Sequence, residues 1–186
     1  MYYAALVPCV FSAFVGVSVA KFLGLAPEHY EIGLVPEFGA SSALLTVLIG
    51  ILCACVGIFL CVSLHQCGHA YRKVFPNPYI RVLAGSAIFI VLTLLFPARL
   101  YNGSGAQIIE MVFEGEKIPV YAFLMKILFT GVALGAGFKG GEIVPTLTVG
   151  AAFGYLMSLV TGLPVGLCAS VGMACLFVSV TNCPVS

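Results

Sequence analysis

One stretch of this sequence combines glycines, charged residues and a proline in a pattern that could bind an anion. Residues 137–150 read GFKGGEIVPTLTVG and lie between runs of almost purely apolar residues. The glycines interrupt one helix, and the proline fits the first turn of the next, where its missing N–H group costs nothing. The first N–H groups of the new helix have no intrahelical partner and carry about half a positive charge. Because glycine lets a ligand approach the backbone closely, the pattern predicts an anion site built from backbone, and its residues are Gly140, Gly141, Glu142, Ile143, Val144 and Pro145.

Two ionisable residues near this site each allow two interpretations. Lys126 lies in the middle of the apolar run VYAFLMKILFTGVAL, where an ionisable side chain is a functional hypothesis by default. Either it makes an anion pathway electropositive, or its stem packs along the helix while its ammonium group pairs with a carbonyl or a glutamate. Glu142 either complements the dipole of the new helix as a cap, or competes with the anion and responds to protonation.

A second group of side chains could bind zinc. His65 and His69 are four residues apart in CVSLHQCGHAYRK, with Cys67 between them. No carboxylate or second cysteine pair completes a ligand set at close spacing, so a cluster at the cytoplasmic interface without a metal is favoured. A membrane enzyme that uses this cluster is a weak alternative, because no nucleophile–base pair or acidic pair accompanies it. We therefore expect no enzyme activity, no metal and no cofactor.

Composition indicates the class of protein that carries these residues. The 186 residues are 61% hydrophobic and 8% charged, whereas soluble domains carry about 25% charged residues, so the chain is expected to be an integral membrane protein. Its net charge of +1 and lack of a Lys/Arg cluster argue against nucleic-acid binding. The first apolar run has no positively charged region before it, so it is interpreted as a retained helix rather than a signal peptide. All eight cysteines lie in or beside apolar segments, which favours buried free thiols.

The apolar runs predict an all-α, multi-pass membrane protein. The first two runs are long enough for a straight span of about 20 residues, while several later ones are short or interrupted by glycine and proline. Such broken segments indicate half-helices that meet near the bilayer midplane. A short re-entrant or interfacial helix is expected after the Asn102–Gly105 turn. The predicted helices cover 2–25, 42–64, 81–97, 105–113, 119–136, 143–161 and 164–180.

Loop charge predicts the orientation of the first two helices. The segment between the second and third runs carries Arg72, Lys73 and Arg81, whereas the segment between the first and second contains only acidic charges. The positive-inside rule places the basic segment in the cytoplasm and the acidic one outside. The acidic residues are Glu28, Glu31 and Glu37.

Two segments resemble the CLC family of chloride channels and proton/chloride antiporters. LMKILFTGVALGAGFKGGEIVPTLTVGAAFG (124–154) is similar to the family signature, in which a helix with a mid-membrane basic residue and a glycine-rich break precede a Gly-x-Phe-x-Pro motif. SVGMACLFVSVTNCPVS (170–186) resembles a later family segment, where a Gly-Met-Ala run precedes an Asn/Arg-x-Pro helix start. The pattern before them fits the second inverted half of a CLC subunit and the helix preceding it. The resemblance implies the CLC-type inverted-repeat fold with broken, re-entrant half-helices.

The resemblance also implies transport of chloride or another small anion across the membrane, through a channel or in exchange for protons. It implies that the backbone N–H groups of Glu142 and Ile143 face the central anion. Ile143 stands where the motif has phenylalanine and Glu142 adds a carboxylate, so a fluoride exporter is an alternative. Ser104, as the inverted-repeat counterpart of the family's serine motif, is a candidate for anion contact.

The same resemblance implies a homodimer in the lipid bilayer of a bacterial plasma membrane, with one anion pathway in each subunit and residues 2–25 at the dimer interface. The family's gating and proton-relay glutamates belong to the first half, and its late tyrosine is expected beyond Ser186. We therefore expect a fragment of a CLC subunit, without catalytic residues in this chain. A truncated membrane fragment that only packs or dimerises is the remaining alternative.

Overall fold

The computed structural model describes residues 6–25, 30, 39–96 and 99–181, and these form helices without β-strands. The chain divides into two units, residues 1–30 and 31–186. The first unit contains α1 (Leu6–Phe22), a helix of 17 residues that is apolar on every side. It ends three residues before the predicted boundary because Gly24 adopts a left-handed conformation (φ +79°), which terminates helices readily.

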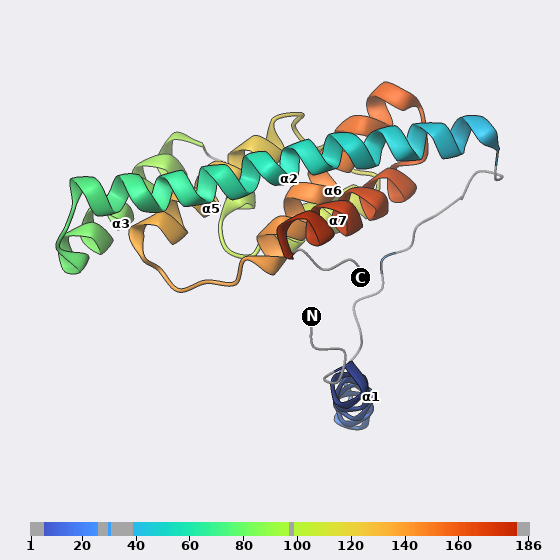
Figure 1. The fold of residues 1–186 in the computed structure, drawn as a ribbon, viewed down its shortest axis with the longest axis horizontal. Coiled ribbons are helices and arrows are strands. Elements are labelled where there is room, and N and C mark those ends of the chain that lie inside the picture. The colour runs from blue at the N-terminus through green and yellow to red at the C-terminus, as the bar shows by residue number, and fades with distance from the viewer. Residues whose placement is uncertain (1–5, 26–29, 31–38, 97–98, 182–186) are drawn as a thin grey trace. The chain divides into compact units, whose positions relative to one another are not determined.

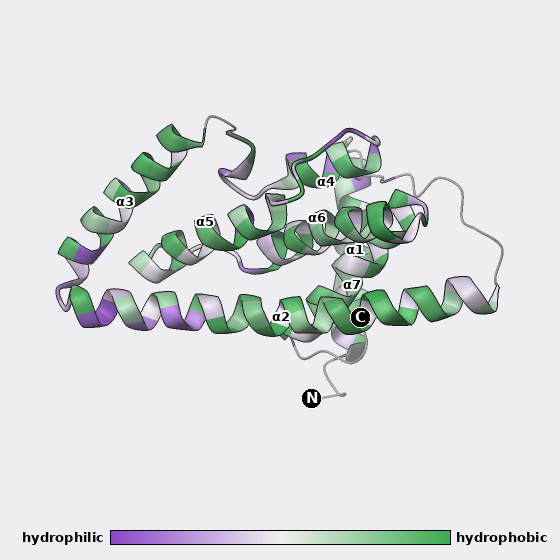
Figure 2. Cartoon of the chain, turned by 90° about the horizontal axis from the view of Figure 1, so that it is seen from above, coloured by the Kyte–Doolittle hydropathy of each residue, from purple (hydrophilic) through white to green (hydrophobic). Residues whose placement is uncertain are grey.

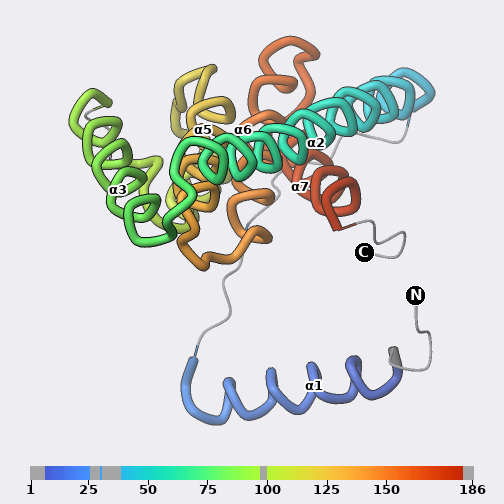
Figure 3. Tube along the Cα trace, turned by 60° about the vertical axis from the view of Figure 1, so that its left-hand side comes forward, coloured from blue at the N-terminus to red at the C-terminus, as the bar shows by residue number. Residues whose placement is uncertain are grey.

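The second unit contains the remaining helices. α2 lies along α5, α6 and α7 (Figures 1 and 3), while α3 packs on α5, and α4 packs on α6 and α7. The elements are α2 (Ala40–Val74), α3 (Pro78–Leu95), the 3₁₀ turn η2 (Arg99–Tyr101), α4 (Ala106–Phe113), α5 (Ala122–Ala136), α6 (Ile143–Thr161) and α7 (Val165–Thr181).

The segment expected to be a basic loop is mostly helical. α2 has 35 residues and continues ten residues past the predicted end at 64, so Arg72 and Lys73 lie in its last turn. Cations are favourable at a helix C-terminus, and the helix ends where Phe75 precedes a proline, which disfavours helical backbone. Asn77 then caps α3 by accepting a hydrogen bond from the Tyr79 N–H (3.0 Å). The acidic residues used for the predicted orientation (Glu28, Glu31, Glu37), and Cys183, lie outside the described residues.

Among the described residues, three helices are long and apolar enough to cross a membrane: α2, α3 and α6. α1, α5 and α7 are apolar but shorter. Figure 2 shows hydrophilic residues in the last turns of α2 and around α4, whereas most of the remaining helical surface is hydrophobic. The short lengths of α5 and α7 agree with the expectation that some helices do not span the bilayer straight.

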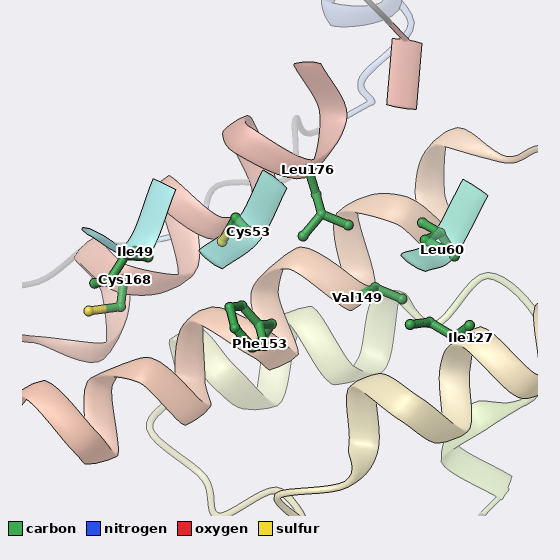
Figure 4. Close-up of a cluster of buried hydrophobic side chains, with 8 residues drawn as sticks. All are labelled: Ile49, Cys53, Leu60, Ile127, Val149, Phe153, Cys168 and Leu176. Carbon is green, nitrogen blue, oxygen red and sulfur yellow. The ribbon is translucent and has the colours of Figure 1, made fainter. Parts of the chain in front are cut away.

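The core of the second unit is an apolar cluster between α2 and the α5–α7 helices (Figure 4). Two of its members, Cys53 and Cys168, are fully buried, and the seven described cysteines are all free thiols. Burial of these side chains stabilises the α2 layer against α5, α6 and α7. The cluster comprises Ile49, Cys53, Leu60, Ile127, Val149, Phe153, Cys168 and Leu176.

Glycines allow α6 and α7 to pack backbone against backbone. A Cβ atom added at Gly150 would lie 2.6 Å from the carbonyl oxygen of Gly172, and one added at Gly154 would meet the carbonyl oxygen of Cys168. Small residues permit this close approach between membrane helices. The contact fixes α6, and therefore the position of its N-terminus, against α7.

Candidate anion-binding site

The site begins where α5 ends. Gly137 has φ +101°, and its N–H donates to the carbonyl of Leu134 (3.0 Å), while the Phe138 N–H donates to the carbonyl of Ala133 (3.3 Å). These two hydrogen bonds at a left-handed glycine form a Schellman motif, which ends a helix by giving partners to its last carbonyl groups. The chain then runs without helical structure to Ile143, where α6 begins (Figure 3).

Arg81 of α3 holds the end of α5 in place. Its Nε donates to the carbonyl oxygen of Ala136 (3.3 Å), one of the four C-terminal carbonyls that have no partner inside a helix. A cation at this end also complements the helix dipole. Gly85, one turn further along α3, packs directly on Ala136, so α3 positions the residue from which the break starts.

The first turn of α6 presents free backbone donors. Glu142 is the N-cap residue, and its carbonyl accepts from both the N–H (3.1 Å) and the hydroxyl (2.7 Å) of Thr146. Its carboxylate makes no capping hydrogen bond. The N–H groups of Ile143 and Val144 have no partner inside the helix, and Pro145 has no N–H. Residues 140–144 are exposed in this chain, so the positive end of the helix dipole is accessible.

A cavity of about 420 Å³ brings this helix start together with two other predicted residues. Gly140, Gly141, Val144 and Pro145 line one part of it, and Ser104 and Lys126 line another. The described residues of its lining include no aspartate or glutamate. Glu142 and Ile143 do not line the cavity and lie beside it, exposed, at the start of α6.

Lys126 is buried in α5, with 1% of its surface exposed. Its Nζ donates to the carbonyl oxygens of Tyr101 (3.1 Å) and Gly103 (2.8 Å), and the structure gives it no carboxylate partner among the described residues. The Lys126 ammonium group therefore bonds to carbonyl oxygens, which is one of the two arrangements expected from the sequence. Since a lysine has three N–H donors, one remains beyond these two bonds.

Ser104 lies in the turn before α4. Its Oγ accepts from the Ala106 N–H (3.4 Å), and its carbonyl oxygen accepts from the hydroxyl of Thr148 (3.4 Å). The turn depends on left-handed backbone at Gly103 (φ +66°) and Gly105 (φ +86°), a conformation that glycine adopts without strain. It leads directly into α4, whose eight residues are buried on one side.

Two residues that the sequence did not single out belong to the same region. Tyr101 lines the cavity with 2% of its surface exposed, and its hydroxyl has no hydrogen-bond partner among the residues that the structure describes. Thr148 of α6 is fully buried and bonds the Ser104 carbonyl. Tyr101 precedes the glycine-rich turn in a single 3₁₀ turn, so no periodicity marked it. Thr148 was visible only as part of the motif that follows the break.

The His65, Cys67 and His69 side chains do not form one cluster. Cys67 faces α5, where a Cβ added at Gly131 would lie 3.2 Å from its sulfur, while both histidines are exposed. Within the described part of the chain, no three His, Cys, Asp or Glu side chains are arranged to hold a metal ion.

The whole chain is similar to known anion-transport proteins. The sequence profile of the voltage gated chloride channel family matches residues 1–186. The "Chloride/fluoride channel protein" of Pseudomonas syringae pv. tomato is 30% identical over 192 residues, covering 100% of this chain and 42% of that protein. "Voltage-gated ClC-type chloride channel ClcB" of Escherichia coli O9:H4 is 27% identical over 196 residues, covering 100% of this chain and 46% of ClcB.

The fold is also that of a solved relative. The crystal structure of a CLC-type fluoride/proton antiporter superimposes with a TM-score of 0.91 at 28% identity, over 97% of this chain and 46% of that one. The chain thus spans less than half the length of the relatives it matches. This likeness confirms the predicted fold class, an all-α membrane protein of the CLC type. The chain is an integral membrane protein and belongs to the voltage-gated chloride channel (CLC) family.

Proposed function

We propose that this chain forms one wall of a transmembrane anion pathway, with the anion bound at the N-terminus of α6. The observation that carries the proposal is that one cavity is lined by all of Gly140, Gly141, Ser104 and Lys126. The described lining of this cavity contains no carboxylate. The geometry of α6 and the family membership both support an anion at this position.

The physical argument is that an anion inside a membrane needs donors in place of water. Free N–H groups at a helix start supply partial positive charge without requiring a full buried counterion. Lys126 adds a fixed charge next to the same cavity. A buried ammonium without a carboxylate partner is itself costly, so an anion in the cavity and Lys126 stabilise each other. Weak, distributed donors of this kind bind an ion yet allow it to leave.

Chloride and fluoride are the two candidate substrates. Chloride follows from the family as a whole, whose relatives include chloride channels. Fluoride is favoured by a specific departure from the family motif: Ile143 replaces phenylalanine and Glu142 adds a carboxylate. The names of two relatives, a chloride/fluoride channel protein and a fluoride/proton antiporter, point the same way.

Flux measurements test the proposal. The complete gene product that contains these 186 residues is reconstituted in liposomes, and chloride, fluoride and proton movements are recorded with selective electrodes. We expect halide efflux. Proton uptake driven by this efflux, in the opposite direction to the halide, would identify an antiporter. If the folded, inserted protein moves neither halide, transport is rejected and a packing or dimerisation role takes its place.

The assembly is proposed on family grounds. We expect a homodimer in a bacterial plasma membrane, with α1 at the subunit interface and one pathway in each subunit. We expect no enzyme activity, since the relatives are channels or transporters. Cross-linking of single-cysteine variants at α1 in membranes, with the native cysteines removed, should yield dimers; exclusively monomeric protein would contradict this assembly.

Glu142→Gln should raise halide flux. The carboxylate is exposed at the start of α6 and makes no capping bond, so its negative charge is free to repel or replace an anion there. Because glutamine keeps the shape of the side chain and removes the charge, we expect flux from proteoliposomes to increase relative to the wild type. Glu116→Gln, in the exposed segment after α4, serves as the control with wild-type flux. Wild-type flux in Glu142→Gln would mean that the residue is only a cap.

A further inference from the structure

The turn that carries Ser104 is attached to two helices through its carbonyl groups. Lys126 of α5 donates to the carbonyls of Tyr101 (3.1 Å) and Gly103 (2.8 Å). The hydroxyl of Thr148 in α6 shares its one proton between the carbonyl of Val144, four residues earlier (2.9 Å), and that of Ser104 in the turn (3.4 Å). Three carbonyls within four residues are thus bonded to side chains from outside the turn. Both donors are buried: Lys126 is 1% exposed and Thr148 is fully buried.

Gly105 shows how closely the turn is seated on these two side chains. A Cβ atom added there would lie 2.8 Å from both Cε and Nζ of Lys126 and 2.9 Å from Cγ2 of Thr148. Distances this short are below normal van der Waals contact, so the backbone at Gly105 lies directly against both residues. The same two side chains therefore support the turn through hydrogen bonds and through packing.

These bonds determine which groups of the turn can face an anion. Carbonyl oxygens repel anions, and a carbonyl that is bonded to Lys126 or Thr148 has its oxygen directed toward that donor. Ser104 and Gly103 line the cavity together with the first turn of α6. Holding the carbonyls on Lys126 and Thr148 keeps the Ser104 hydroxyl, whose proton has no acceptor within the turn, available to the cavity.

We infer that Lys126 and Thr148 act as positioning residues, which fix the Tyr101–Gly105 turn so that Ser104 faces the anion cavity. This inference rests on the proposed anion site and assigns separate roles to the two residues that support it. Lys126 acts through the turn as well as through its charge, whereas Thr148 is uncharged and acts through hydrogen bonds and packing alone. A role for Lys126 in electrostatics only would leave exchange of the turn unchanged in Thr148→Val, because the shorter bond of Thr148, to the Val144 carbonyl (2.9 Å), lies within α6.

The test compares charge-changing and charge-neutral variants in the complete gene product. Lys126→Met removes the donors, and Lys126→Arg retains charge and donors. Thr148→Val replaces the hydroxyl with a methyl group of similar size and leaves the charge unchanged. Thr161→Val is the matched control, because Thr161 makes the same bond to the carbonyl four residues earlier (2.7 Å, to Met157) at the opposite end of α6. Two quantities are measured: the halide concentration that gives half-maximal flux, and hydrogen–deuterium exchange of residues 99–106.

We expect Thr148→Val to raise the half-saturating halide concentration about fivefold, which corresponds to the loss of one ordinary hydrogen bond. Exchange in the 99–106 segment should rise in Thr148→Val and in Lys126→Met, with Lys126→Arg restored toward wild type and Thr161→Val unchanged. A protein that merely loses global stability would instead show faster exchange throughout α5 and α6.

Either of two results would overturn the inference. The first is a Thr148→Val protein with wild-type exchange in the turn, whatever its half-saturation, since Thr148 would then act only within α6, through its bond to the Val144 carbonyl, or not at all. The second is faster exchange in the turn without any change in half-saturation, since the turn would then be held but would not serve the site. If Lys126→Met does not fold, Thr148→Val still decides. If the wild-type protein carries no halide, the proposed function fails, while the exchange data independently report whether the two residues hold the turn.

Discussion

Gly141→Val is expected to reduce halide flux about tenfold or more, equivalent to about 1.4 kcal/mol of lost anion binding. Gly141 lines the cavity at the start of α6, and a Cβ atom added there would meet no atom within 4 Å. The valine side chain therefore fits the folded chain but occupies the space through which an anion approaches the backbone. Flux from proteoliposomes, normalised to the amount of inserted protein, measures the effect.

The control for this experiment is Gly68→Val. Gly68 lies in α2, and a Cβ there also meets no atom within 4 Å, so both variants add the same side chain to open space. Gly68→Val should retain flux within about twofold, since substitutions away from packed features change stability little. Equal flux in the two variants would exclude Gly141 from the anion site.

Gly154→Val should be the most destabilising substitution in α6. Its Cβ would meet the carbonyl oxygen of Cys168 and lie 2.7 Å from Cα of Ala169, and these are backbone atoms that cannot rotate away. α6 and α7 would have to separate, which we expect to lower the free energy of unfolding by about 3 kcal/mol, at the upper end of ordinary overpacking. Unfolding in detergent, followed by circular dichroism, measures the change.

Gly68→Ala provides the matched comparison, because it adds a methyl group to a helical glycine that has open space. Replacing glycine by alanine within a helix is favourable by up to about 1 kcal/mol, so this variant should be at least as stable as the wild type. A Gly154→Val protein with wild-type stability would show that α6 and α7 are not packed as described.

The glycine-rich break could be predicted closely because its signal is local. The predicted range 143–161 coincides with α6, and the end of α5 at Ala136 coincides with the predicted end of the preceding run. Glycine and proline act through their own backbone preferences, so sequence alone locates the places where they interrupt a helix. One of the two segments that resemble the family, residues 124–154, contains the same local motif.

The end of α2 could not be located from hydropathy. The helix continues through His65, His69, Arg72 and Lys73 because polar residues in a terminal turn are compatible with helical backbone, while hydropathy marks only the apolar part. A better signal was Pro76, which disfavours helical backbone in the residue before it. The end of a membrane segment and the end of a helix are different boundaries.

The partners of buried polar groups were also beyond sequence reasoning. Lys126 and the carbonyls that it bonds are 23 and 25 residues apart, and only the tertiary arrangement of η2, α4 and α5 brings them together. Both interpretations of Lys126 were stated, yet composition and spacing could not choose between them. Thr148 was overlooked because its second acceptor, the Ser104 carbonyl, is 44 residues away.

The length of α2 has a consequence for the choice of lipid. Its 35 residues extend about 52 Å at 1.5 Å per residue, well beyond a hydrocarbon core of about 30 Å. Tilting within the usual limit of about 40° shortens its projection only to about 40 Å. The polar last turns must therefore protrude from the hydrocarbon, and the depth of α2 depends on how its apolar part matches the acyl-chain length. Since α2 packs on the helices that carry the cavity, the protein should respond to hydrophobic mismatch, with different transport rates in thin and thick bilayers.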